Sequence, residues 1–146
     1  MSIKEAQEKI VANMKQWQKI ENAGIVSTGK IMEKVDNPVV RLVMEIIQRD
    51  SQMHYRVQQL IVESLESKAL SLAPDELATV WGMIEDHVKL ERQTIELATK
   101  SLAEISKAKG MLVQHYLLKY LLADEKKHEE ILINLEKIKG GMYPYA

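Results

Sequence analysis

Three ionisable side chains, Asp124, Glu125 and His128, interrupt an apolar helical pattern late in the chain. On a helical wheel centred on His128, four leucines fall within about 40°, namely Leu117, Leu121, Leu132 and Leu135. Asp124 and Glu125 flank this apolar line one turn before the histidine. A carboxylate and an imidazole three residues apart on one helix face can bind the same metal ion. The stretch therefore predicts one side of a metal site, and other segments must supply the rest.

Four long amphipathic segments are available to supply those other sides. Apolar residues recur at spacings of three and four positions in each segment, which is typical of helices that bury one face. The predicted helices cover about residues 2–35, 38–67, 74–106 and 111–139. Long helices joined by short segments predict an all-α, antiparallel four-helix bundle over residues 1–139, followed by a short tail at 140–146 that we expect to be irregular.

The breaks between the segments contain residues that start and end helices. Pro38 and Pro74 each stand in the first turn of a predicted helix, and Gly110 follows a lysine-containing stretch at the end of the third. Residues 65–73 could just span the length of the bundle, ~30 Å, as a crossover, and could easily form a simple hairpin. Both connections stay open.

Composition limits the functions that the chain can have. Its 146 residues are 46% apolar and 28% charged, which favours one soluble helical domain. The net charge of −1 gives no electrostatic reason to expect nucleic acid or an anionic membrane as a partner. The absence of a long apolar run and of an apolar leader predicts a cytoplasmic protein. The absence of cysteine excludes disulfides, cysteine-ligated zinc and iron–sulfur clusters.

The two halves of the chain repeat each other. Aligned in register, their polar interruptions coincide in the pairs Glu21 with Glu91, Asp50 with Asp124, and His54 with His128. Amphipathic periodicity alone would align the apolar positions, but it would not align glutamate with glutamate or histidine with histidine. The pattern therefore predicts an internal two-helix repeat, with one extra turn in the second copy, and a site with approximate twofold symmetry.

The polar interruptions lie near the midpoints of the predicted helices, and they are Glu21, Asp50, His54, Glu91, Glu125 and His128. Helix midpoints reach the same depth in an antiparallel bundle, so we expect these side chains to cluster. Buried carboxylates must be neutralised by protons, by lysine or arginine, or by metal ions. Lysine and arginine are missing from the core lines beside these acids. A pair of metal ions is the simplest explanation.

In this arrangement the chain resembles the ferritin-like superfamily, and within it the rubrerythrin-type di-iron carboxylate proteins, here without a rubredoxin domain. These proteins place one glutamate on each of the first and third helices, and Glu-x-x-His on the second and fourth. Glu21 and Glu91 match the single glutamates, and Glu125 with His128 matches the motif of the fourth helix. The resemblance, which spans nearly the whole chain, implies two iron ions, with manganese or zinc as alternatives. It implies that their ligands are Glu21, His54, Glu91, Glu125 and His128.

The second predicted helix departs from the family pattern. Ser51 stands where the ligand glutamate is expected, three residues before His54. Asp50 could swing in as the missing ligand, or His87 could fill the gap from the third helix. An intact two-ion site, a mononuclear or altered site and an empty site all stay open.

The resemblance also implies a supporting role for the aspartates. Each would accept a hydrogen bond from a ligand histidine on the facing helix and fix its tautomer, Asp50 for His128 and Asp124 for His54. The catalytic residues would be the metal ligands themselves.

Two functions follow from these expectations. The first is a non-haem di-iron protein that reacts with O₂ or peroxide or oxidises Fe(II). As an enzyme it would be an oxidoreductase of the peroxidase or ferroxidase kind. Its electrons would come from an external donor, because the chain has no cysteine that could bind iron in a donor site of its own. The second is a non-catalytic bundle with a degenerate or structural metal site that acts as an oligomerising or interaction protein. In either case the family resemblance implies a homodimer or higher homo-oligomer.

Overall fold

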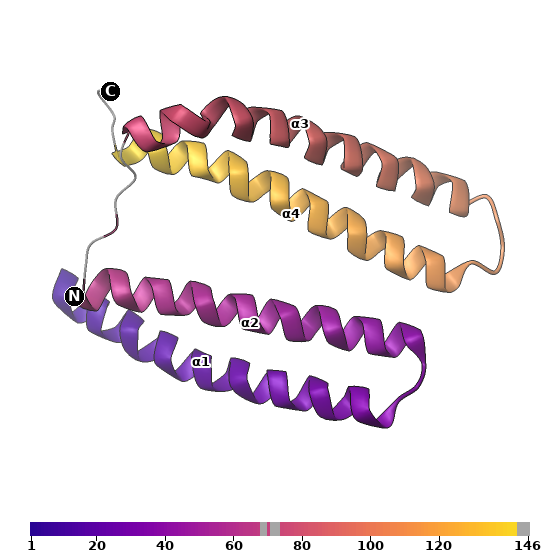
Figure 1. The fold of residues 1–146 in the computed structure, drawn as a ribbon, viewed down its shortest axis with the longest axis horizontal. Helices are drawn as coiled ribbons and strands as arrows, with labels where there is room; N and C mark the ends of the chain where they lie inside the picture. The colour runs from indigo at the N-terminus through magenta and orange to yellow at the C-terminus, as the bar shows by residue number, and fades with distance from the viewer. Residues whose placement is uncertain (68–69, 71–73, 143–146) are drawn as a thin grey trace. The chain divides into compact units, whose positions relative to one another are not determined.

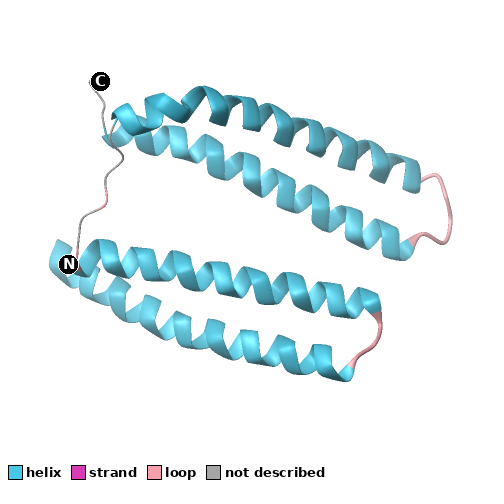
Figure 2. Ribbon diagram, in the orientation of Figure 1, coloured by secondary structure: helices cyan, strands magenta, loops and turns pink. Residues whose placement is uncertain are grey.

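The computed structural model describes residues 1–67, 70 and 74–142, and these form four α-helices and no strand (Figures 1 and 2). The helices are α1 Ile3–Lys34, α2 Pro38–Glu66, α3 Pro74–Ile105 and α4 Leu112–Met142. The all-α prediction is confirmed. Helix α1 pairs with α2 and α3 pairs with α4, which is the pairing of neighbours in a four-helix bundle. The chain divides into two compact units, Met1–Leu70 and Ser71–Ala146, each built on one helical hairpin.

Local capping explains where the first hairpin begins and turns. Ser2 and Glu5 form a capping box at the start of α1, in which each side chain bonds the other residue's main-chain N–H. At the start of α2, Asn37 Oδ1 accepts hydrogen bonds from the N–H groups of Val39 and Val40. The Arg41 guanidinium then donates back to carbonyls at the end of α1.

The second hairpin is bounded by an acidic first turn and a glycine. Asp75 and Glu76 lie in the first turn of α3, where their negative charges interact favourably with the positive end of the helix dipole. Gly110, in the connection between α3 and α4, has φ +86°. This left-handed conformation is one that glycine adopts without strain and that side chains disfavour.

The end of α4 differs from the prediction. The two glycines after Lys139 are expected to end the helix, yet α4 continues through Met142. Glycine weakens a helix by only ~1 kcal/mol relative to alanine, and it ends one only where it takes up a left-handed conformation. Among the described glycines only Gly110 has a positive φ, so residues 140–142 stay helical. The rest of the predicted tail, 143–146, lies outside the described residues.

The α1–α2 interface is held by glutamines that reach from one helix to the other. Gln18 Nε2 donates to Gln59 Oε1 at 3.0 Å, and Gln48 Nε2 donates to the Ile25 carbonyl at 3.1 Å. Gln58 is the most deeply buried of them, with 3% of its surface exposed. The repeat aligns these four glutamines with apolar residues of α3 and α4, namely Val88, Ile133, Leu122 and Leu132. The first hairpin is therefore joined by amides where the second is joined by hydrocarbon.

Within the described residues, the buried apolar side chains are few, and they are Val62, Leu77 and Ala98. Two helices enclose little interior, so most apolar side chains lie only partly covered. No helix in the described ranges combines the length and apolar character needed to cross a membrane.

Candidate metal centre

Glu91, Glu125 and His128 come together between α3 and α4. One ligand atom from each side chain lies within 4.8 Å of the other two. Glu125 and His128 share a face of α4 because three residues span almost one helical turn, and Glu91 meets them from α3. In residues 1–67 and 74–142 this is the one group of three such side chains with this spacing. Three of the ligands that the sequence predicts therefore lie together within one hairpin.

The orientation of His128 suits a metal ligand. Its Nε2 lies 3.3 Å from Asp124 Oδ2, one turn earlier on the same helix. Its Nδ1 lies 3.5 Å from Glu91 Oε1 and 3.6 Å from Glu125 Oε2. The ring therefore lies with Nε2 beside Asp124 and with Nδ1 beside the two carboxylates of the cluster. Lys127 Nζ lies 2.6 Å from Asp124 Oδ1.

Glu91 is the buried member of the cluster, with 7% of its surface exposed. Its Oε1 lies 2.9 Å from His87 Nε2. Its Oε2 is buried and has no hydrogen-bond partner among the described residues. An unpaired buried carboxylate oxygen is costly, and a bound cation is one of the few groups that can compensate it.

The two glutamates of the cluster shift each other's pKa in opposite directions. Interaction with Glu125 lowers the pKa of Glu91, and its contacts with His87 and His128 act in the same direction against burial. The same interaction raises the pKa of Glu125, and burial adds to that rise. Of the two carboxyl groups, Glu125 therefore takes up a proton more readily, and a divalent cation entering the cluster would compete with that proton.

Thr94 supports Glu125 from the facing helix. Its Oγ1 lies 3.1 Å from Glu125 Oε2 and 2.7 Å from the main-chain carbonyl of Glu91. This threonine is a residue that sequence reasoning missed. The repeat aligns it with Gly24, and that difference between the two halves is the signal that could have found it.

The residues present fit a first-row divalent metal ion. Two carboxylates and one imidazole are donors that iron, manganese and zinc all accept, and His87 offers a second imidazole one turn from Glu91. The buried, unpartnered Glu91 Oε2 is the structural observation that favours an ion here.

The first hairpin brings its predicted residues together differently. His54 Nδ1 lies 3.2 Å from Glu21 Oε1, so these two predicted ligands do meet. Gln58 Nε2 donates to the same carboxylate oxygen at 3.3 Å. Ser51 is buried in the place of the expected glutamate, where a Cβ added at Gly24 would lie 3.5 Å from its Oγ. Gln58 is the second residue that sequence reasoning missed, and the repeat aligns it with Leu132.

Asp124 contacts His128 on its own helix. Residues four apart lie one above the other on a helix, so Asp124 reaches His128 without leaving α4. The role toward His54 that the resemblance implies for Asp124 stays a prediction. Asp50 is half-buried on α2, directly before Ser51, and its predicted role as a ligand or as the partner of His128 stays a prediction.

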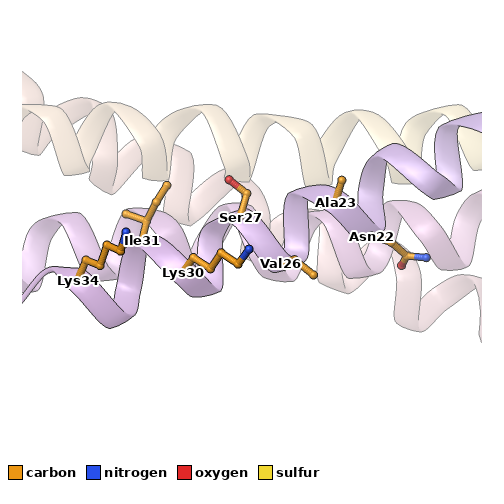
Figure 3. Close-up of a pocket in the computed structure, with 7 residues that line it drawn as sticks. All are labelled: Asn22, Ala23, Val26, Ser27, Lys30, Ile31 and Lys34. Carbon is orange, nitrogen blue, oxygen red and sulfur yellow. The ribbon is translucent and has the colours of Figure 1, made fainter.

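A hollow of about 600 Å³ lies along α1 (Figure 3). All of its lining residues come from α1, and they are Asn22, Ala23, Val26, Ser27, Lys30, Ile31 and Lys34. This lining contains neither carboxylate nor imidazole, so the hollow lacks the donors of a metal site.

No family model, no curated protein and no solved structure matches the chain. What can be said of its chemistry therefore comes from the geometry of its own side chains.

Proposed function

We propose that this chain is a non-haem metal protein in which the α3–α4 hairpin binds a divalent iron ion through Glu91, Glu125 and His128. The observation that carries the proposal is the buried Glu91 Oε2, which lacks a partner in the described part of the chain and belongs to the cluster of three ligand groups. Manganese and zinc are the alternative ions, because the same donors accept them.

Bound iron would supply electron exchange with O₂ or peroxide, or would itself be oxidised from Fe(II), with an external donor returning the electrons. The protein's own residues prepare the place for it. Asp124 lies beside Nε2 of His128 and would keep Nδ1 turned toward the carboxylates, and the Thr94 hydroxyl bonds Glu125. Burial of Glu91 keeps water from competing for its oxygens, so their negative charge acts on the ion at short range.

Iron loading tests this function directly. Metal-free protein is loaded with Fe(II) under anaerobic conditions, bound iron is counted, and near-ultraviolet absorption is followed after exposure to oxygen or peroxide. We expect bound iron and the absorption of ferric iron in the wild type, and loss of both in Glu91→Gln and in His128→Ala. His115→Ala and Glu130→Gln are the controls, because both side chains are exposed on α4, the helix that carries His128. Both variants should behave as wild type. A wild-type protein that takes up no iron would rule the proposal out.

A second function keeps the metal but not the redox chemistry. Large apolar side chains such as Leu60 on α2 and Leu97 on α3 are exposed, which favours a role in oligomerisation with a structural metal site. In that case zinc would raise the melting temperature, loaded iron would not respond to oxygen or peroxide, and the mass in solution would be that of a homodimer or higher homo-oligomer. Mass measurement beside the oxygen experiment separates the two functions.

A further inference from the structure

Glu21 of the first hairpin is as buried as Glu91 of the second, with 7% of its surface exposed. Its surroundings are different. Oε1 of Glu21 lies 3.3 Å from the donating Nε2 of Gln58 and 3.2 Å from Nδ1 of His54. A buried carboxylate needs such compensation, and here the Gln58 amide donates to it while the His54 ring lies beside it.

Gln58 can act on Glu21 in one orientation only. Its Nε2 points at the carboxylate, which leaves its Oε1 buried and without a partner among the described residues. Turning the amide over would bring its oxygen against the carboxylate, and two acceptors facing each other would repel. The amide is therefore fixed with its positive end toward Glu21, where an ion would have to bind.

The first hairpin also lacks donors for an ion. Ser51 occupies the position aligned with Glu125, and among the described residues of α1 and α2 no third carboxylate or imidazole joins Glu21 and His54 in a group that could hold a metal ion. The second hairpin offers two carboxylates and one imidazole, and its residue aligned with Gln58 is Leu132, which cannot hydrogen-bond. The first hairpin thus has an amide donor where the second has leucine, and it lacks a ligand carboxylate where the second has Glu125.

We infer that Gln58 and His54 take the place of a metal ion beside Glu21, so that the chain binds one divalent ion, in the α3–α4 hairpin, where the family pattern implies two. This inference rests on the proposed metal site of α3–α4. The first hairpin keeps the buried glutamate of the repeat as a hydrogen-bonded structural element that does not depend on metal.

Cobalt(II) titration tests the number and the place of the ions. Metal-free full-length protein is titrated with Co²⁺, with calorimetry and the visible cobalt spectrum as readouts and circular dichroism as a check of folding. We expect one ion per wild-type chain. Glu91→Gln combined with His128→Ala should weaken Co²⁺ binding more than about 100-fold. The matched pair in the first hairpin, Glu21→Gln combined with His54→Ala, should still bind one ion with affinity within about threefold of wild type.

A converted variant tests the cause. Ser51→Glu together with Gln58→Leu gives the first hairpin the donors of the second. Positions 24 and 51 touch in the first hairpin, as Thr94 and Glu125 do in the second, and Gly24 leaves the new glutamate without a competing side chain. We expect this variant to bind two Co²⁺ ions, with the second lost again on adding Glu21→Gln.

The outcomes separate this inference from the proposed function. A wild type that binds no ion overturns both. A wild type that binds two ions, or one ion that is lost in the Glu21 and His54 variant, overturns the inference and leaves metal binding intact. A folded converted variant that stays at one ion shows that Ser51 and Gln58 are not what prevents binding. If the converted variant does not fold, the paired losses in the two hairpins still decide the number and place of the ions.

Discussion

Asp124 Oδ2 lies 3.3 Å from His128 Nε2 on the same face of α4, and this contact leaves the other ring nitrogen, Nδ1, on the side of Glu91 and Glu125. We expect Asp124 to favour the tautomer with the ring proton on Nε2, which would make Nδ1 a lone-pair donor toward those two carboxylates. The contact joins a residue that would not touch the metal to one that would. It gives Asp124 a positioning role.

Asp124→Asn should therefore weaken metal binding although it removes no ligand. A neutral amide makes His128 less basic and permits the other tautomer, and losses of this kind cost about 10–100-fold in metal affinity. Co²⁺ titration measures the affinity. Nitrogen chemical shifts of the metal-free protein show directly whether Nδ1 or Nε2 carries the proton. Glu130→Gln, an exposed change on the same helix, is the control. Unchanged affinity together with an unchanged tautomer would remove Asp124 from the site.

Thr94→Val should weaken metal binding through Glu125. Valine has the shape of threonine but lacks the hydroxyl that lies 3.1 Å from Glu125 Oε2, so the carboxylate gains freedom to turn away. A hydrogen bond of this kind contributes about 0.5–1.5 kcal/mol, which corresponds to roughly 2–13-fold in affinity. Thr99→Val is a matched control on α3, because its hydroxyl bonds only the Ile95 carbonyl among its described contacts. Equal effects of the two variants on Co²⁺ affinity would mean that Thr94 acts on the helix rather than on Glu125.

The sequence was enough to predict the helices because each is marked by its own apolar period and its own terminal residues. Asn37 and Pro38, for example, define the start of α2 by a hydrogen bond and a fixed φ that involve neighbours only. The end of α4 was missed because a glycine pair permits a helix as well as a turn, and nothing local decides between them.

Within the candidate site, spacing predicted the cluster of Glu125 and His128 because both lie on one helix face. The partners of these side chains were harder to predict. Whether Asp124 turns to its own histidine or to another helix depends on rotamers, which a wheel does not show. Gln58 was overlooked because a glutamine on a helix usually faces water. Its significance appears only once the structure places its amide against a buried glutamate.

Glu125→Gln should stabilise the metal-free protein at neutral pH while abolishing its metal site. The pKa of Glu125 is raised, chiefly by its hydrogen bond with Glu91 and further by burial. A group that holds its proton more tightly when folded contributes stability below its ordinary pKa and loses that contribution as the pH rises through the raised value. Glutamine mimics the protonated form at every pH, so the variant keeps what the glutamate loses.

Thermal melting of metal-free protein measures this effect. A gain of 1 kcal/mol raises the melting temperature of a chain of this size by about 2–4 °C. We expect the difference from wild type to be largest near pH 7 and to shrink as the pH falls and Glu125 itself becomes protonated. Glu130→Gln should show no such trend, because it is exposed on the same helix. A variant that melts below wild type at pH 7 would contradict a raised pKa of Glu125 in the folded protein.

Gln58→Leu should destabilise the first hairpin without affecting metal binding. The change removes the amide that donates to Glu21 Oε1 at 3.3 Å. His54 then remains as the other described side chain beside that oxygen. Leaving a buried carboxylate short of a partner costs about 1–3 kcal/mol, reduced by the relief of the unpartnered Gln58 Oε1. Denaturant unfolding, with and without Co²⁺, measures the loss. Gln52→Leu, at an exposed position of α2, is the control for added apolar surface. Because Gln58 lies in the hairpin that we infer to be free of metal, the loss should be the same in both conditions, and a loss that Co²⁺ reverses would place an ion beside Glu21 after all.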